Sequence, residues 1–199
     1  MSALNKIKEE IKENKILYYY INKQIRHICV FSEKDDKAYC IKDILEFKDI
    51  FEDSNILKCG YKQKEDYIFL KNLNIDVKNL MFDIEIAGYI LNSNINKYTI
   101  EYLANEYIQF DVDAYISSLG VVENQNTQLN MFDSVGAGAL VVPQDNSYIK
   151  DCVYVYAIRQ LQNVLASKMK ETDSLDLFGN IEMPLSEVLA DMQYVRNVC

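Results

Sequence analysis

Three short apolar segments near the start of the chain constrain the fold most strongly. They cover residues 15–21, 26–31 and 38–41, and the polar stretch S-E-K-D-D-K joins the second segment to the third. Apolar runs of this length, joined by a polar turn, predict strands and a β-hairpin. A helix is predicted ahead of them at 3–14, because its apolar residues recur at helical spacing.

The remainder of the chain is predicted to be mostly helical, with one further strand at 55–59. Helical spacing of apolar residues predicts the other helices, at 43–52, 62–72, 80–91, 100–108, 148–170 and 174–195. Thr99 is the expected cap of the helix at 100–108. Pro184 is expected in or near the first turn of the last helix, or at a kink in it. The polar segment 117–146 is predicted to be a mobile connection. A strand meander followed by helix, strand and more helices favours an α/β fold with a mixed sheet flanked by helices.

The charge balance argues against a free-standing nucleic-acid-binding domain. The 199 residues include 21 basic and 30 acidic side chains, a net charge of −9, whereas binding to phosphates needs a basic face. Five scattered cysteines without a C-x-x-C pair, and a single histidine, suit a reducing cytosol and predict no zinc site. With no signal segment and no apolar run long enough to cross a bilayer, we expect a cytoplasmic location and no membrane partner.

Three later stretches of the sequence resemble a known family. The run A-I-R-Q-L-Q-N-V-L-A-S-K-M, followed by I-E-M-P-L-S-E-V-L-A-D-M, resembles the junction between the 3′–5′ exonuclease and polymerase domains of family A DNA polymerases, the bacterial DNA polymerase I type. The stretches F-D-I-E-I-A-G-Y-I-L-N-S and L-K-C-G-Y-K-Q-K-E-D resemble earlier segments of the same family. The resemblance implies an RNase H-like, DnaQ-like exonuclease fold. It also implies an exonuclease-like domain at 1–172 and the start of the polymerase (thumb) segment at 173–199.

The resemblance also implies a metal site, from which this sequence departs. The family's exonuclease uses two divalent metals, bound by D-x-E on the first strand, an Asp in the second motif, and an Asp on a late helix near a Tyr. Here the first strand, I-L-Y-Y-Y-I-N, contains no acid. Tyr18 and Tyr20 fall on the D-x-E positions, although the alignment can slip by one residue. A phenol is neutral near pH 7 and cannot replace two carboxylates.

The remaining motif positions are only partly preserved. Asp66 falls on the second-motif Asp, but Lys62 replaces the preceding Asn with a cation that would repel a metal. The third-motif Tyr is Tyr148, whereas its Asp position falls on Cys152, a poor magnesium ligand, with Asp151 one residue away. We therefore expect no catalytic residue and no metal ligand in what we call the vestigial pocket. Its residues are Tyr18, Tyr20, Asp66, Tyr148 and Cys152.

By this resemblance, we expect a catalytically inactive exonuclease-like structural domain of a DNA polymerase I that acts in DNA replication and repair. No cofactor is expected in this part of the protein, with magnesium serving the parent polymerase. The expected partners are the polymerase domain of the same chain and, through that polymerase, DNA, which the isolated fragment would bind weakly or not at all. One alternative is an active metal-dependent 3′–5′ exonuclease in which Asp66 and Asp151 converge with Asp83 or Glu85. The other is a module that binds single-stranded DNA or a protein through exposed tyrosines.

Three other features could be mistaken for sites. The literal D-x-E at Asp83-Ile84-Glu85 lies in a predicted helix, where Asp83 suits the helix start. The G-A-G-A stretch at Gly136 lacks the Lys-Ser/Thr of a phosphate loop and is interpreted as a loop. His27 has no nucleophile at convincing spacing and is interpreted as a structural strand residue. Cys152 would need a histidine base to act as a nucleophile, and nothing in the sequence places His27, the one histidine, beside it.

Overall fold

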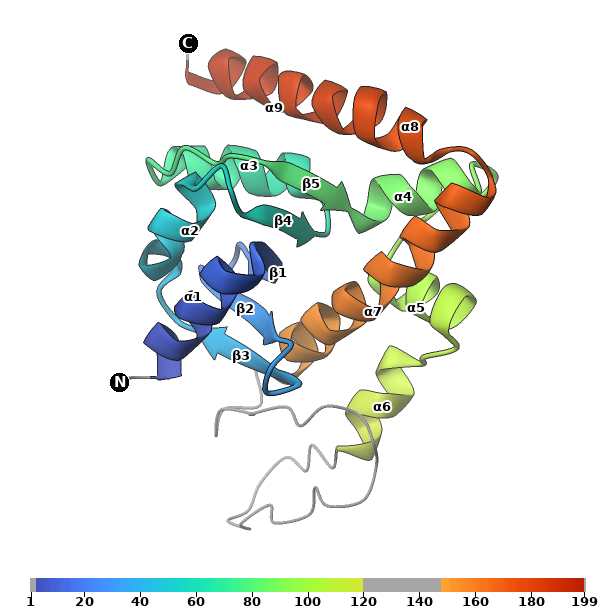
Figure 1. The fold of residues 1–199 in the computed structure, drawn as a ribbon, viewed down its shortest axis with the longest axis horizontal. Helices are drawn as coiled ribbons and strands as arrows, with labels where there is room; N and C mark the ends of the chain where they lie inside the picture. Colours follow the sequence, from blue (N-terminus) through green and yellow to red (C-terminus); the bar gives the residue numbers. More distant parts are fainter. Residues whose placement is uncertain (1–2, 120–147, 199) are drawn as a thin grey trace.

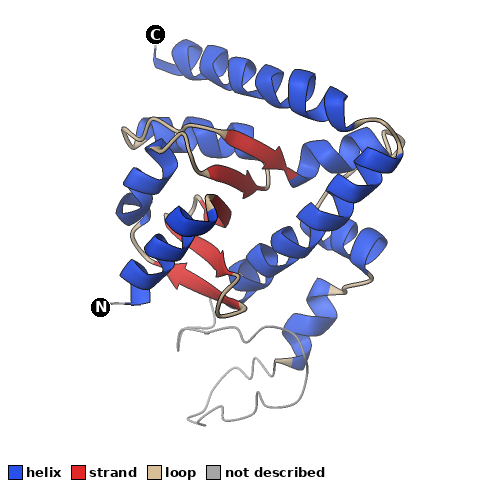
Figure 2. Cartoon of the chain, viewed as in Figure 1, coloured by secondary structure: helices blue, strands red, loops and turns tan. Residues whose placement is uncertain are grey.

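The computed structural model describes residues 3–119 and 148–198, and its centre is a mixed sheet. Five strands lie in the order β3-β2-β1-β4-β5 (Figure 2). They are β1 (Ile16–Asn22), β2 (His27–Ser32), β3 (Lys37–Ile41), β4 (Leu57–Gly60) and β5 (Leu80–Asp83). The first three form an antiparallel meander, whereas β4 runs parallel to both β1 and β5. The predicted α/β class and leading meander are confirmed.

Helices cover both faces of this sheet (Figure 1). Before the undescribed segment they are α1 (Ala3–Asn14), a 3₁₀ turn (Ile44–Phe47), α2 (Lys48–Glu52), α3 (Gln63–Asn72), α4 (Ile84–Leu91), α5 (Ile100–Ile108) and α6 (Val112–Ser118). After it they are α7 (Ile149–Glu171), α8 (Leu175–Leu177), a π-helical turn (Phe178–Glu182) and α9 (Met183–Val198). One face packs against α7, α4 and α5, and the other against α1, α2 and α3. None of the helices described has the length and apolar content that a bilayer span requires.

Side-chain alternation along β1 divides the interior into two cores. Leu17, Tyr19 and Ile21 pack among the residues of α1, α2 and α3. Tyr18 and Tyr20 point the other way, into the core beneath α7. Because successive side chains of a strand alternate between faces, three consecutive tyrosines contribute to two separate cores.

Two predicted helices are partly wrong. The segment 80–91 divides into strand β5 and helix α4, because residues 80–83 pair with β4 and Asp83 caps the helix that follows. The segment 174–195 divides into α8, the π-helical turn and α9. Pro184 lies in the first turn of α9, directly after the π-helical turn and inside a continuous run of helical backbone. It therefore removes one N–H from the helical hydrogen bonds at the place where the helix type changes.

The region around the predicted connection at 117–146 is described only in part. Helix α6, which was not predicted, begins after the N-cap residue Asp111 and includes Ser117 and Ser118. The rest of that connection, including Gly136, lies outside the described residues.

The C-terminal helix α9 lies along one side of the domain, beside α3 and β5 (Figure 1). Ala190 is buried in the core that α3 also lines. The Tyr67 hydroxyl donates to Asp191 Oδ1 at 2.7 Å, and Lys71 Nζ lies 3.3 Å from the same oxygen. The inner side of α9 is therefore fixed to the domain by both apolar and polar contacts.

Candidate functional site

Tyr18 and Tyr20 lie on the side of β1 that faces α7. Tyr18 is 5% exposed, and the guanidinium of Arg159 lies 5.5 Å from its ring centre. Burial raises the pKa of Tyr18 to about 12. The ring of Tyr20 packs edge-to-face against Tyr154 at 5.0 Å, and burial raises the pKa of Tyr20 as well. Both phenols are therefore neutral near pH 7 and carry no charge for a metal.

The middle tyrosine belongs to the opposite core. Tyr19 is fully buried, and its ring meets Phe51 edge-on with the ring centres 5.3 Å apart. With Tyr18 and Tyr19 both buried, neither presents an open ring face on which a nucleotide base could stack. Tyr18 and Tyr19 therefore lack the exposure that the single-stranded DNA alternative requires, and the half-buried Tyr20 packs against Tyr154.

Asp66 is buried on α3, and its charge partner comes from the end of β1. Its carboxylate is 1% exposed, and Lys23 Nζ lies 2.7 Å from Asp66 Oδ1. Burial raises the pKa of Asp66 to about 7, an effect that the Lys23 cation partly opposes. A side-chain cation therefore stands beside the one carboxylate that the sequence places in register with the family motif.

Asp151, rather than Cys152, points toward the end of β1. Its Oδ2 lies 2.8 Å from His27 Nε2 and accepts a hydrogen bond from Asn22 Nδ2 at 2.9 Å. Although burial lowers the pKa of His27, its contacts with Asp151 and Cys40 raise it to about 9. The Asp151 carboxylate therefore favours the protonated, cationic form of His27 beside it.

The two other residues predicted from the third motif lie on either side of this pair. The ring of Tyr148 packs edge-on against His27, with centroids 4.6 Å apart. Cys152 is fully buried, and its Sγ lies 3.8 Å from Cys29 Sγ. Cys152 therefore contacts β2 and not the end of β1.

Comparison with known proteins identifies the family. Residues 6–115, more than half of the chain, match the family described as DNA polymerase I, ribonuclease H-like domain. The chain belongs to this family. It is 30% identical over 165 residues to DNA polymerase I of Borreliella burgdorferi and 24% identical over 149 residues to that of Bacillus subtilis. These matches cover 81% and 74% of the chain but only 16% and 15% of the relatives, so the chain spans less than a fifth of their length.

A solved structure agrees in fold with this DNA polymerase I ribonuclease H-like domain. It is described as the POL domain of Pol1 from M. smegmatis in complex with DNA primer-template and dNTP. The match covers 94% of the chain and 30% of that structure, with a TM-score of 0.65 and 13% identity. The predicted RNase H-like fold and DNA polymerase I family are thus confirmed.

Within this ribonuclease H-like domain, the predicted pocket residues do not form one cluster, since Cys152 contacts β2. After burial, Asp151 and Asp66 both contribute to the raised pKa of Tyr20, so the two carboxylates lie within electrostatic reach of this tyrosine. Sequence reasoning missed Asn22 and Lys23 and treated His27 only as a structural residue. The alternation of side chains between the two faces of a strand could have identified Asn22, because it lies on the same face of β1 as Tyr18 and Tyr20.

The literal D-x-E of the domain is a helix start, as the sequence indicates. Asp83 is 1% exposed, and its carboxylate accepts hydrogen bonds from the backbone N–H groups of Lys62, Gln63 and Glu85 at 3.2, 2.7 and 2.8 Å. Burial nevertheless raises the pKa of Asp83. With both of its oxygens used by backbone donors, this carboxylate joins the beginnings of α3 and α4.

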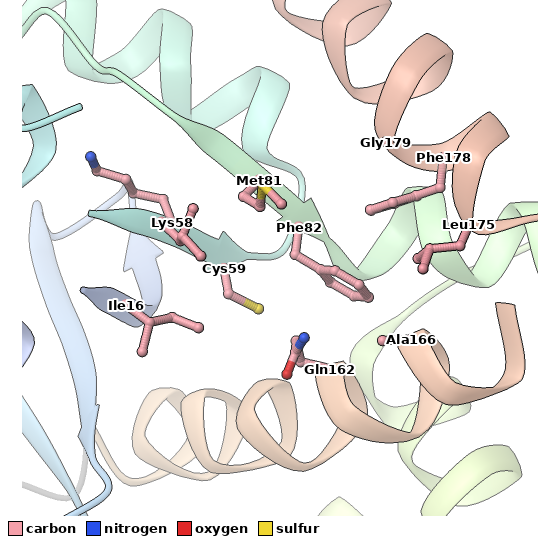
Figure 3. A pocket seen from close by; sticks show the side chains of 11 residues that line it. Ile16, Lys58, Cys59, Met81, Phe82, Gln162, Ala166, Leu175, Phe178 and Gly179 are labelled. Atoms are coloured by element: carbon pink, nitrogen blue, oxygen red, sulfur yellow. The ribbon is translucent and has the colours of Figure 1, made fainter. Parts of the chain in front are cut away.

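An apolar pocket of about 260 Å³ lies elsewhere in the domain, between β4, β5, α7 and α8 (Figure 3). Phe82 and Phe178 both line it, with ring centroids 4.8 Å apart. Its polar lining side chains are Lys58 and Gln162, and none of the residues of the vestigial pocket borders it. A pocket without carboxylate or imidazole side chains does not suit metal-dependent hydrolysis.

Proposed function

We propose that the chain is a catalytically inactive 3′–5′ exonuclease-like domain of a DNA polymerase I, with a structural role in DNA replication and repair. The observation that carries this proposal is the charge pairing at the end of β1. Asp66 faces the ammonium of Lys23, and Asp151 faces the imidazole of His27. Each surviving carboxylate thus already has a protein cation where an active site of this family would need a metal.

The residues present do not fit a pair of magnesium ions. Magnesium prefers carboxylate and carbonyl oxygens in octahedral arrangement, whereas the D-x-E positions of this chain hold neutral phenols. In residues 3–119 and 148–198, the one group of three or more potential ligands that converges is His27, Cys29 and Cys40, which contains no carboxylate. We therefore propose that the domain has no catalytic metal, and that magnesium serves only the parent polymerase.

An exposed apolar stripe supports the structural role. Six apolar residues along the π-helical turn and α9 each lie three or four positions from another of the six, and each is between 42% and 64% exposed. They are Ile181, Leu185, Val188, Leu189, Met192 and Val195. Such a stripe matches one face of a helix and favours packing against another protein surface. We propose that 173–199 begins the polymerase portion and that the stripe packs against the rest of it, through which the protein contacts DNA.

The decisive test is digestion of a 3′-tailed oligonucleotide in the presence of manganese, which tolerates imperfect ligand sets. The purified chain is compared with the variants Asp66→Ala and Asp151→Ala, and with Asp173→Ala as a matched substitution away from β1. We expect no shortening of the oligonucleotide in any sample. Shortening that is lost in Asp66→Ala or Asp151→Ala but retained in Asp173→Ala would mean that a rearranged carboxylate site is active, and would overturn the proposal.

A further inference from the structure

Three cysteines and the single histidine come together beside the vestigial pocket. His27 and Cys29 are two residues apart on β2 and so share the face that packs under α7. Cys40 on β3 is the register partner of Cys29, and Cys152 reaches Cys29 from α7 with a 3.8 Å Sγ–Sγ distance. Cys152 stands more than a hundred residues from the other three in the sequence, so spacing alone gave no indication of the cluster. Sheet pairing and the packing of α7 create it.

Three of these four residues already converge closely enough for a metal centre, and Cys152 reaches the group through Cys29. One ligand atom from each of His27, Cys29 and Cys40 lies within 4.8 Å of the other two. With Zn–S bonds of about 2.3 Å and Zn–N bonds of about 2.0 Å, the ligand atoms of a zinc tetrahedron stand roughly 3.5–3.8 Å apart. The observed Cys29–Cys152 distance of 3.8 Å matches such an edge. Cys152 does not lie within 4.8 Å of all three other ligand atoms, so metal binding would require its side chain to move toward His27 and Cys40.

The surroundings of His27 resemble those of a metal-ligating histidine. Asp151 Oδ2 lies 2.8 Å from His27 Nε2, and Asn22 Nδ2 donates to that same oxygen at 2.9 Å. A carboxylate on one ring nitrogen fixes the orientation of the ring and directs the other nitrogen toward a metal. That other nitrogen, Nδ1, is buried and has no hydrogen-bond partner in the described part of the chain. Besides Asp151, the side chain that acts on His27 is Cys40, another member of the cluster.

We propose that His27, Cys29, Cys40 and Cys152 bind one thiophilic divalent cation of the Zn²⁺ class as a closed structural site. Three thiolates and one imidazole are a common set for structural zinc and a poor one for magnesium or calcium. His27, Cys29 and Cys152 are buried, as a non-catalytic site requires, while the half-buried Cys40 gives the ion a route of entry. The ion would join β2, β3 and α7. Asp151 would remain in contact with His27, but a zinc-bound imidazole is neutral. In the zinc-loaded protein the proposed loss of nuclease activity therefore rests on the Lys23–Asp66 pair and on the neutral phenols of Tyr18 and Tyr20.

The first experiment is a titration of the reduced, metal-free chain with Co²⁺, followed by displacement with Zn²⁺. We expect one equivalent to bind, with the strong visible bands of tetrahedral cobalt and a near-ultraviolet thiolate-to-cobalt charge-transfer band that Zn²⁺ abolishes. An excess of Mg²⁺ should leave the spectrum unchanged. Absence of the charge-transfer band, or weak octahedral bands alone, would overturn the proposal.

Single substitutions then locate the site. Cys29→Ser and Cys40→Ser should weaken zinc binding by more than 100-fold, whereas Asp151→Asn, which alters a positioning residue, should weaken it about ten- to a hundred-fold. Cys59→Ser is the matched control, because Cys59 is also buried beneath α7 but stands outside the cluster. An equal loss in Cys59→Ser, or full affinity in Cys40→Ser, would contradict the assignment.

A measurement on the unmodified chain covers the case in which a variant fails to fold. Alkylation with and without Zn²⁺, followed by mass mapping, should show metal-dependent protection of Cys29, Cys40 and Cys152 and none specific to Cys59. If the three thiols react equally with and without zinc, the site does not exist. A Cys29–Cys152 disulfide that forms without reductant, together with no zinc binding after reduction, would identify the cluster as a redox pair instead.

Discussion

At position 60 the chain has no room for a side chain, because the ring of Tyr19 fills the space. A Cβ on Gly60 would lie 2.8 Å from Tyr19 Cζ and 2.9 Å from Cε1. Tyr19 cannot move away easily, because it is fully buried against Phe51. The middle tyrosine of β1 therefore determines which residue β4 can carry at its last position.

We predict that Gly60→Ala lowers the free energy of unfolding by about 1–3 kcal/mol, the usual cost of overpacking a core. Urea unfolding measures this change. Gly179→Ala is the control, since a Cβ there meets no atom within 4 Å, and it should leave stability unchanged or slightly raised. Equal effects at both positions would show that the contact with Tyr19 is not the cause.

The Lys23–Asp66 pair allows a direct test of the charge pairing at the end of β1. At pH 8, Lys23→Met should lower the free energy of unfolding by about 1–3 kcal/mol, because it leaves a buried carboxylate without a partner. Adding Asp66→Asn should recover most of this loss, and the exposed Lys34→Met serves as the control. If the stability change of the double variant equals the sum of the two single changes, the two side chains do not interact.

At the scale of single elements, the start of α4 depends on one carboxylate. Asp83→Ala removes the acceptor of three backbone N–H groups and should lower the free energy of unfolding by about 2–3 kcal/mol. Asp83→Asn should cost less, because one oxygen remains. The half-exposed Glu85→Ala should change stability by under about 0.5 kcal/mol in the same denaturation experiment. A comparable loss at both acids would contradict the assignment of Asp83 alone as the cap.

The elements that sequence reasoning found and missed differ in the strength of their local signal. The hairpin of β2 and β3, the helix capped by Thr99 and the long α7 have complete periodic patterns, and all three were predicted. Strand β5 is four residues long and pairs only with β4, so it was read as an extension of the more strongly periodic α4.

The candidate site was less predictable than the fold, for a different physical reason. Tyr18, Tyr20 and Asp66 belong to regular elements, so their positions could be predicted from motif spacing, and their role as a former site stays a prediction. The partners Lys23 and His27 lie at opposite ends of the turn between β1 and β2. Their contacts with α3 and α7 exist only in three dimensions, and no spacing along the chain encodes them.

At the scale of the whole molecule, the buried Lys58 gives the stability of the fold a dependence on pH. Lys58 is fully buried on β4, and its ammonium donates to the backbone oxygen of Asp53. Burial lowers the pKa of Lys58 from 10.5 to about 8. Between these two values the unfolded chain binds a proton that the folded chain has released, so the free energy of unfolding rises with pH. Below pH 8 both states are protonated, and the full cost of the buried cation is present.

We therefore predict that Lys58→Met is more stable than the wild type at pH 7. This advantage should shrink steadily as the pH rises from about 8 to 10.5. Chemical denaturation of both proteins across this range measures the difference, and titrations common to both cancel out. The exposed Lys34→Met should show no such trend, and a constant difference for Lys58→Met would refute the lowered pKa.

The cations at the end of β1 also make single substitutions toward a carboxylate-rich pocket unfavourable. A new carboxylate at Tyr20 alone would add a third negative charge beside Asp66 and Asp151, in a half-buried place where Lys23 and His27 already have partners. Removing Lys23 first would instead leave Asp66 buried and unpaired. We expect each of these single variants to be less stable than the wild type, so building a carboxylate-rich pocket here would need several substitutions at once. The two ion pairs therefore disfavour single substitutions that would add or expose a carboxylate at the end of β1.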